Sequence, residues 1–337
     1  MVAKTIFAPA KINLGLRITG RYANGYHRLE SLFVPISLYD RLTVQSSATD
    51  TVVCDWGAAA NKRQLALGTQ KNPLLWKSIA FAMSKLQATG QDLPPIGVKL
   101  TKRIPSPSGL GGASADAAAL INFLLGESIK SGADSHVPDE YIAASSKLGA
   151  DIPYFLRFGL AGRAAWLCGI GHELFEREIP NLAGWICVPP FGFSTAAMFA
   201  AVRERDLPAC EEEKTPELQA ERRNLALRLN EIHDSDELAV GVRHLTNDFE
   251  SVASAVFPAQ FARLQSAMAT IAQTIRQFMP VEWLMGMTGS GPGLYALTTN
   301  QMEQSVSQLV TGVLRARFAA GWQVYSVKSH TAENIGP

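Results

Sequence analysis

The sequence predicts an α+β protein with two domains, one over about residues 1–178 and one over about 179–337, and an active site in the cleft between them. Three observations support this prediction. The chain has 337 residues, of which 47% are hydrophobic and 18% charged, so it is long enough to bury a sizeable core in each of two domains. Both halves mix strand-like alternation with helical spacing of apolar residues. A glycine-rich segment near residue 110 joins a predicted strand to a predicted helix.

The first half of the chain alternates strands and helices. The pattern predicts strands over 5–18, 28–46 and 96–104, and helices over 72–87 and 114–125. Asn24 and Gly25 are a strong turn signal between the first two strands, which are therefore expected to form a hairpin. The turn itself, in TGRYANGYH, is one place where function is expected.

The second half contains more helix. The pattern predicts a helix over 139–149, ended by Gly149, one or two helices over 251–275, and a helix in the closing segment 305–329. It predicts strands over 163–171, over 184–190 and at the end of the closing segment. The order of elements in the second domain is expected to be ferredoxin-like. Residues 201–245 contain RERD, EEEK and AERR, which predicts a solvated helical insertion on the outside of that domain.

Charge and cysteine content limit the classes of function. The 31 basic and 30 acidic residues give a formal net charge of +1, so the overall charge does not favour nucleic acid or an anionic membrane as a partner. No window has the roughly 18 uninterrupted apolar residues of a membrane span, and the N-terminus has no long apolar stretch after a basic one, so a cytoplasmic protein is expected. The four cysteines form no CxxC pair and are expected to be buried thiols.

The segment IPSPSGLGGASADAAALINFLL, residues 104–125, is the strongest functional candidate. Glycines between a strand and a helix allow close approach of the backbone, and the helix start is electropositive, so the segment suits a phosphate chain. The alanines indicate a helix that packs tightly against a sheet. The spacing fits neither G-x-x-x-x-G-K-[ST] nor G-x-G-x-x-G, which leaves a different phosphate loop or a plain tight turn as alternatives.

Three segments, in order, resemble motifs of the GHMP kinase superfamily: APAKINLGLRITGRYANGYH, PSPSGLGGASADAAA and MTGSGPGLYAL. The first motif and LGADIPYFL at 148–156 are most similar to the members that act on a cytidine diphosphate sugar alcohol. The resemblance implies a two-domain GHMP kinase fold, with an N-terminal ATP-binding domain and a C-terminal ferredoxin-like domain. It also implies transfer of the γ-phosphate of ATP, accompanied by Mg²⁺, to a hydroxyl of that small molecule. A monomer or a homodimer is expected.

Two residues carry the chemistry that the resemblance implies. Asp151 is the base that takes the proton of the acceptor hydroxyl, and Lys11 orients that carboxylate and stabilises the developing negative charge. From the residues alone, Asp151 could equally be a helix N-cap, since Pro153 follows it, and Lys11 could be an exposed strand lysine. The apolar surroundings of Lys11 in AKINLGL speak against that alternative.

The resemblance also implies two binding sets. The ATP set is Lys102, Pro105, Ser108, Gly109, Leu110, Gly111, Gly112, Ala113, Ser114 and Asn72, and the acceptor set is Asn13, Tyr26, His27, Phe199, Thr288, Gly289 and Ser290. Tyr26 and His27 offer a flat ring and edge hydrogen bonds to cytosine, or they only anchor the hairpin. Phe199 is a second stacking ring or a core residue. The segment 288–291 supports the substrate, closes over the phosphates, or is a plain turn between strands.

Some features depart from the family pattern. Ala113 and Ala115 stand where the loop usually has a glycine and a serine, and Ser114 could bind phosphate or magnesium or cap a helix, so the magnesium ligands are not identified. Another GHMP kinase, or a related decarboxylase, that acts on a mevalonate derivative or homoserine would not need Tyr26 and His27. A non-catalytic ATP- or sugar-binding relative is expected to have lost Asp151 or the loop.

Overall fold

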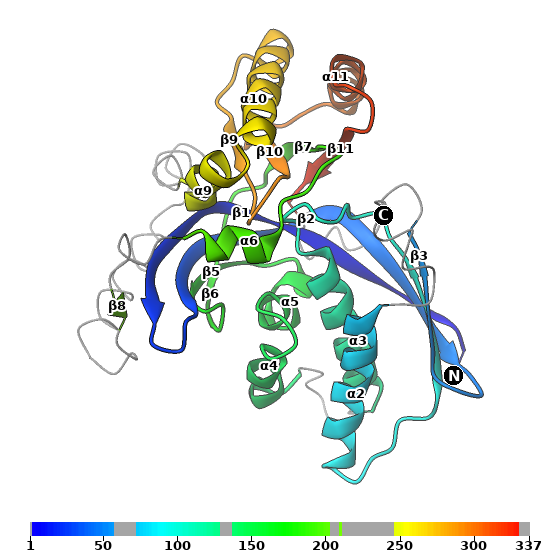
Figure 1. Ribbon diagram of the computed structural model, residues 1–337. Helices are drawn as coiled ribbons and strands as arrows, with labels where there is room; N and C mark the ends of the chain where they lie inside the picture. Colours follow the sequence, from blue (N-terminus) through cyan, green and yellow to red (C-terminus); the bar gives the residue numbers. More distant parts are fainter. Residues whose placement is uncertain (1, 57–71, 129–136, 203–208, 211–245, 330–337) are drawn as a thin grey trace.

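The computed structural model describes residues 2–56, 72–128, 137–202, 209–210 and 246–329. They form two β-sheets with helices on their outer sides (Figure 1). The strands are β1 (Lys4–Tyr22), β2 (His27–Ser46), β3 (Thr51–Asp55), β4 (Ile96–Thr101), β5 (Ala164–Gly169), β6 (Glu173–Arg177), β7 (Ala183–Val188), β8 (Ala209–Cys210), β9 (Leu284–Met287), β10 (Leu294–Thr298) and β11 (Gln323–Lys328). The helices are α2 (Pro73–Gln87), α3 (Gly112–Ser128), α4 (Asp139–Ser145), α5 (Ile152–Arg157), the 3₁₀ turn η2 (Gly159–Ala161), α6 (Thr195–Ala200), α9 (Asp248–Val256), α10 (Pro258–Phe278) and α11 (Gln304–Arg317).

The larger sheet is built on the hairpin of β1 and β2. Its strand order is β3-β4-β2-β1-β8, and β5 pairs with both β2 and β6. At the turn, Gly25 has φ +86°, and the Asn24 side chain accepts a hydrogen bond from the Tyr26 N–H at 3.1 Å. The predicted hairpin is therefore confirmed. A bulge between Leu14 and Arg17 interrupts the pairing of β1 with β2.

Helices α2 to α5 lie on one side of this sheet (Figure 1). Helix α3 contacts α2, α5 and β1. Its residues Ala115, Ala117 and Ala118 are completely buried, because small side chains let the helix approach its neighbours closely. This confirms the predicted reason for the alanine-rich helix start.

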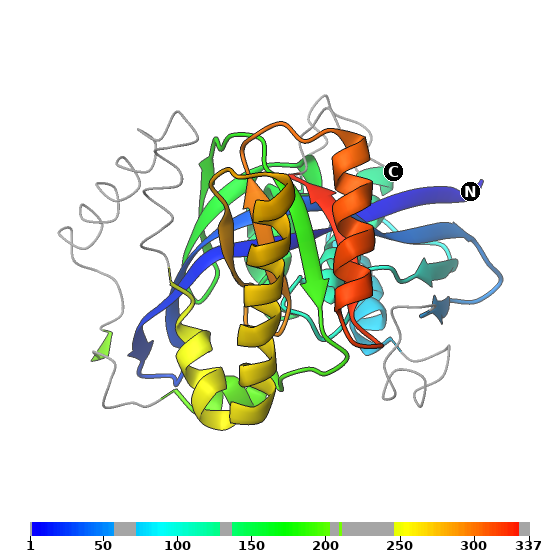
Figure 2. The ribbon, with the colours of Figure 1, turned by 90° about the horizontal axis from the view of Figure 1, so that it is seen from above.

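The smaller sheet lies on the other side of the large sheet, and α10 and α11 cross its outer face (Figure 2). Its antiparallel order is β11-β7-β10-β9. With helices between β7 and β9 and between β10 and β11, this is a ferredoxin-like arrangement. A continuous apolar core joins the two sheets and includes Ile12 and Leu14 of β1, Ile186 of β7 and Leu297 of β10. The predicted α+β class is confirmed.

The predicted elements agree with the structure apart from their ends and the insertion. The segment predicted as one or two helices forms two, α9 and α10, and α4 ends at Ser145 rather than at Gly149. Of the predicted insertion 201–245, residues 203–208 and 211–245 lie outside the described part of the chain, and β8 pairs with β1. The division into domains at about residue 178 stays a prediction.

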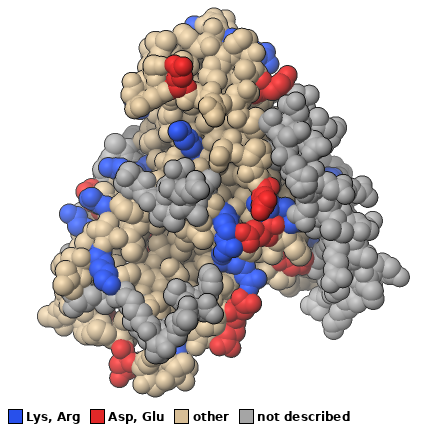
Figure 3. Space-filling model, turned by 180° about the vertical axis from the view of Figure 1, so that it is seen from behind, with Lys and Arg blue, Asp and Glu red and all other residues tan. Residues whose placement is uncertain are grey.

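The surface and the thiols can be compared with the expectations from composition. Basic and acidic side chains are interspersed on the back of the molecule, with a mixed group near its middle (Figure 3). Within the described ranges, no helix combines the length and the apolar character that crossing a membrane requires. Cys54, Cys168 and Cys187 are buried thiols, as predicted, and the side chain of Cys210 lies outside the described part.

Candidate active site

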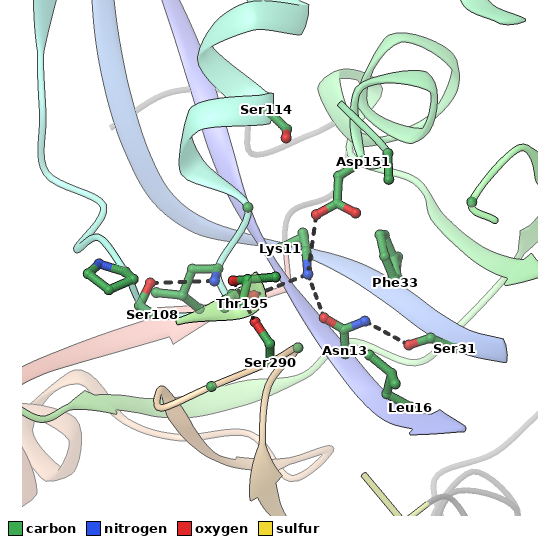
Figure 4. Close-up of a pocket in the computed structure, with 18 of the residues that line it drawn as sticks. Lys11, Asn13, Leu16, Ser31, Phe33, Ser108, Ser114, Asp151, Thr195 and Ser290 are labelled. Atoms are coloured by element: carbon green, nitrogen blue, oxygen red, sulfur yellow. Dashed lines mark hydrogen bonds and ion pairs between the residues drawn. The ribbon is translucent and has the colours of Figure 1, made fainter. Parts of the chain in front are cut away.

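A pocket of about 380 Å³ opens beside the glycine-rich loop that connects β4 to α3 (Figure 4). Residues of β1, β2, β5, α6 and α9, the two residues before α5 and the β9–β10 connection also line it. The predicted site residues in its lining are Lys11, Asn13, Pro105, Ser108, Gly109, Leu110, Gly111, Gly112, Ala113, Ser114, Asp151, Phe199, Gly289 and Ser290. Both predicted catalytic residues and most of the predicted phosphate loop therefore share one pocket.

Lys11 stands on β1 with its ammonium at the centre of this pocket (Figure 4). The residue is only 4% exposed, and its Nζ donates to Asn13 Oδ1 and, at 3.1 Å, to the carbonyl of Gly109. The ammonium also lies 4.6 Å from the centre of the Phe33 ring, a favourable cation–π contact. Burial lowers the pKa of Lys11 below its ordinary 10.5, and the nearby Asp151 opposes part of this shift.

Asp151 faces Lys11 from the residue before α5. Its Oδ2 lies 3.6 Å from Lys11 Nζ, and 28% of its side chain is exposed. Asp151 occupies the N-cap position of α5, yet its side chain makes no capping hydrogen bond. The carboxylate is directed instead toward the ammonium, as Figure 4 shows, and it remains accessible from the pocket.

The glycines of the loop are required by contacts within the protein. A Cβ at Gly109 would lie 2.1 Å from the carbonyl oxygen of Thr288, and Gly109 has φ +77°. A Cβ at Gly112 would lie 2.8 Å from a methyl group of Ile104. The loop is also bound to β1, because the backbone N–H of Lys11 donates a hydrogen bond to the carbonyl of Leu110 at 3.0 Å. The loop is thereby held in place, and the first N–H groups of α3 are left for an anion.

The β9–β10 connection packs directly against this loop. The Gly293 N–H donates to the carbonyl of Ser108 at 3.0 Å. Thr288 is fully buried, and its hydroxyl accepts the backbone N–H of Asn13 at 2.9 Å. Ser290 bonds to Thr195 of α6 at 3.1 Å. The connection therefore supports the glycine loop and Asn13 through these hydrogen bonds, which a plain turn between strands would not do.

Lys102 lies outside the pocket lining. Its ammonium is buried between the carboxylates of Asp40 and Asp116, at 2.8 Å from Asp116, and Asp40 also accepts the N–H groups of Arg103 and Ile104. Burial would lower the pKa of Lys102, but Asp116 and Asp40 raise it above 10.5. Burial and the neighbouring Asp40 raise the pKa of Asp116 well above its ordinary value, against the opposing charge of Lys102.

Asn72 also lies outside the pocket lining. It is the N-cap of α2, and its side chain accepts the Leu75 N–H at 3.2 Å. Asn72 therefore stabilises the start of α2. Contacts of Asn72 and Lys102 with ATP stay predictions.

The predicted nucleobase residues lie around the β1–β2 turn. Tyr26 is 62% exposed, and the ring of His27 lies 5.4 Å from that of Phe199. Phe199 in turn meets Phe249 edge to face, at 4.8 Å. Burial, and secondarily the charge of Arg21, lower the pKa of His27 below 6.5, so its imidazole is neutral at pH 7 and can both donate and accept a hydrogen bond.

Sequence reasoning missed the residues that hold this site from behind. The Asn247 amide donates to the carbonyls of Met287 and Gly289, at 2.7 and 2.9 Å, while its oxygen caps α9. Glu250 accepts the Met287 N–H at 3.1 Å. The pattern Asn-x-x-Glu was a readable helix-start signal. Nothing in the local sequence indicated that its side chains would support the β9–β10 connection. Ser31, buried behind Asn13, was missed as well.

The donors in the pocket suit a metal ion that arrives with a phosphate chain. Ser114 and Asp151 present side-chain oxygen atoms to the pocket. Among the described residues, no group of three or more His, Cys, Asp or Glu side chains could hold a metal ion. Mg²⁺ commonly keeps several waters and takes most of its remaining ligands from substrate phosphates, so a hydroxyl beside the glycine loop, as at Ser114, fits it.

The pocket thus brings together an ammonium, a carboxylate and the start of a helix. These are the groups that phosphoryl transfer to a hydroxyl requires. The fold is that of the GHMP kinases. A crystal structure of 4-(cytidine 5'-diphospho)-2C-methyl-D-erythritol kinase matches with a TM-score of 0.65 and 25% identity, over 97% of this chain and 99% of that one. Phosphomevalonate kinase of Streptococcus pneumoniae, at a TM-score of 0.59 and 11% identity, shows the fold alone.

Curated sequences give the more specific relationship, whereas no family model matches. The 4-diphosphocytidyl-2-C-methyl-D-erythritol kinase of Prosthecochloris aestuarii is 30% identical over 320 residues, which cover 94% of this chain and 97% of that relative. The kinase of the same name from Protochlamydia amoebophila is 36% identical over 203 residues, so that match covers 59% of this chain and only 62% of the relative. The chain belongs to the 4-diphosphocytidyl-2-C-methyl-D-erythritol kinase family.

Proposed function

We propose that this protein transfers the γ-phosphate of ATP to the 2-hydroxyl of 4-diphosphocytidyl-2-C-methyl-D-erythritol, a step of the methylerythritol phosphate route to isoprenoid precursors. The observation that carries the proposal is the facing pair of Lys11 and Asp151 beside the glycine loop, at 3.6 Å. The names of the full-length relatives supply the acceptor.

Asp151 acts as the base in this proposal. Its carboxylate is open to the pocket and is not used as a helix cap, so it is free to take the proton of the acceptor hydroxyl. Lys11 keeps the carboxylate oriented and offers positive charge to the oxygens of the phosphoryl group in transit. Because Lys11 is buried, its charge is little screened by water and acts strongly at short range.

The glycine loop and the first turn of α3 hold the phosphates of ATP. The N–H groups at the start of a long helix attract an anion, and the loop glycines let the loop pack closely against Thr288 and Ile104, which holds the start of the helix in place. Ser114 would contact the Mg²⁺ that accompanies ATP, with phosphate and water oxygens completing the shell of the ion, and the ion would neutralise phosphate charge.

The aromatic residues beside the β1–β2 turn bind the cytosine. Phe199 lies against His27 on one side and Phe249 on the other, so it is held rigidly. The neutral His27 can pair with the edge of the base, and the exposed Tyr26 can close over its face. No such residues are needed for mevalonate or homoserine.

The reaction is tested by supplying ATP with three acceptors, the cytidylylated methylerythritol, mevalonate and homoserine, and measuring ADP release. Phosphorylation of the first alone is expected. The Asp151→Asn variant should bind ATP almost normally and turn over at least about 100-fold more slowly. Wild-type turnover by that variant would remove Asp151 as the base, and preference for another acceptor would overturn the proposed substrate.

The cytosine site is tested by titration with cytidine diphosphate. Tyr26→Ala should weaken its binding by about 5- to 150-fold, since stacking of a base on an aromatic ring contributes about 1–3 kcal/mol. Neither Tyr26 nor Phe278 is in the lining of the pocket, but Phe278, which is 38% exposed, ends α10 and does not belong to the β1–β2 turn, so Phe278→Ala is a matched control. Unchanged affinity of the Tyr26 variant, with a lowered melting temperature, would mean that the ring only anchors the hairpin.

A further inference from the structure

Ser31 lies behind the pair of Lys11 and Asp151, at a place where the large sheet is irregular. It is 1% exposed and belongs to β2. It stands opposite the bulge of β1, where Gly15 has φ +71°. The Ser31 hydroxyl donates to the carbonyl of Gly15 at 2.6 Å and accepts from Asn13 Nδ2 at 2.8 Å. Bulges often redirect side chains beside active sites.

The carbonyl of Gly15 fixes the direction of these hydrogen bonds. A carbonyl can only accept, so the single proton of the Ser31 hydroxyl is committed to it. The side of the Asn13 amide that faces Ser31 must then be its NH₂ group. Asn13 Oδ1 is consequently directed toward Lys11, whose ammonium can only donate. The opposite orientation of the amide would place an NH₂ group against the ammonium.

This orientation determines how Lys11 is presented to the pocket. The ammonium has three N–H groups, one of which goes to Asn13 Oδ1 and another to the carbonyl of Gly109. Both acceptors are fixed, since Asn13 is held by Ser31 and Thr288 while Gly109 is held against the β9–β10 connection. The third N–H group is left for Asp151 and for a phosphoryl oxygen. Figure 4 shows the series from Ser31 through Asn13 and Lys11 to Asp151.

We propose that Ser31 is a positioning residue for phosphoryl transfer, which fixes the Asn13 amide so that Lys11 is held toward Asp151. This inference rests on the proposed function of Lys11 and Asp151. Without the hydroxyl, the Asn13 NH₂ group loses its acceptor and the amide can rotate. Lys11 then loses a fixed partner, and its ammonium is both less well placed and more easily deprotonated.

The experiment compares Ser31→Ala with Ser31→Thr, which keeps the hydroxyl. Ser31→Ala is expected to lower kcat by about 10- to 100-fold, with the KM for ATP within about twofold of the wild type, because the loss is one of positioning. The alkaline limb of kcat/KM should also move to lower pH, because Lys11 loses a hydrogen bond that favours its charged form. Ser31→Thr should restore both. If Ser31→Ala does not fold, Ser31→Cys keeps the shape with a weaker polar group and should show the same changes, smaller in size.

The matched control is Ser307→Ala on α11. Ser307 is 8% exposed, and its hydroxyl bonds to that of Ser326 at 2.6 Å, so a similarly buried hydroxyl is lost outside the pocket. Its kcat and pH profile should equal those of the wild type. A folded Ser31→Ala with wild-type kcat and pH profile, beside an inactive Asp151→Asn, would overturn the positioning role alone. Full turnover by Asp151→Asn would overturn the proposed chemistry and the role of Ser31 together.

Discussion

The two loops of the site pack tightly at Gly109, and replacing this residue by alanine tests whether their close packing supports catalysis. The new Cβ would lie 2.1 Å from the carbonyl oxygen of Thr288, whereas real Cβ contacts stay beyond 3.0 Å. One loop must therefore move by about 1 Å. Gly109 also has φ +77°, where a side chain is strained. Both effects act on the loop that is proposed to hold ATP.

The two contributions can be separated with glycines elsewhere in the chain. Gly90 has φ +74° and nothing within 4 Å of its Cβ position, so Gly90→Ala introduces only backbone strain, about 1–2 kcal/mol. A Cβ at Gly293 would lie 2.4 Å from the carbonyl of Ser108 without a left-handed φ, so Gly293→Ala introduces only the overlap, about 1–3 kcal/mol. Gly109→Ala combines both and should cost about 2–5 kcal/mol.

The assay combines urea unfolding with steady-state kinetics in ATP. A displacement of about 1 Å at a positioning loop can cost about 100-fold, so kcat/KM for ATP should fall by roughly that factor in Gly109→Ala. Gly293→Ala should show a smaller loss, and Gly90→Ala should keep the wild-type value. If Gly109→Ala matches Gly90→Ala in both stability and kcat/KM, the close packing of the loops has no importance for the site.

Three further predictions concern charge and support. Because burial lowers the pKa of Lys11, the alkaline limb of kcat/KM should lie below pH 10.5. The residual activity of Lys11→Arg should lack this limb, since arginine keeps its charge. A limb that persists in Lys11→Arg would contradict the assignment of the limb to Lys11. The raised pKa of Asp116 means that the folded state keeps this proton at pH values where the unfolded state, with a pKa near 3.8, has lost it. The free energy of unfolding should therefore fall as the pH rises above about 4, by up to about 1.4 kcal/mol per pH unit. Asp116→Asn should remove this slope in urea unfolding, and an unchanged slope would show that another group titrates. Asn247→Ala removes a helix cap and two hydrogen bonds to the β9–β10 connection, and it should lower the free energy of unfolding by about 2–4 kcal/mol. A decrease of less than about 0.5 kcal/mol would refute the supporting role of Asn247.

The parts of the fold that the sequence could predict are those with local signals. The hairpin of β1 and β2 follows from alternation around Asn24-Gly25, and α3 follows from an alanine-rich apolar run after glycines. The pairing of Lys11 with Asp151 was predicted through resemblance alone, since 140 positions separate them in the chain and spacing gives no hint of it. The structure brings the two side chains together, while their catalytic roles stay a proposal.

The supporting residues could not be predicted because their partners are distant in sequence. Asn247 bonds to carbonyls 40 and 42 residues further along the chain, and a helix-cap signal says nothing of them. Lys102 reads as a lysine before a phosphate loop, but its ammonium lies between Asp40 and Asp116, which flank it at separations of 62 and 14 residues. A sequence pattern identifies the polar residue, whereas only the packing of strands and helices decides which partner it meets.

The burial of Lys11 shows how the site depends on this packing. An ammonium inside an apolar strand loses its hydration, which is costly unless protein groups replace the water. Here Asn13 Oδ1, the Gly109 carbonyl, the Phe33 ring and Asp151 do so, from four different parts of the chain. Each of these groups also limits where the ammonium can point. The same contacts that make the buried charge tolerable therefore orient it, so a substitution that loosens one of them should lower turnover before it unfolds the protein.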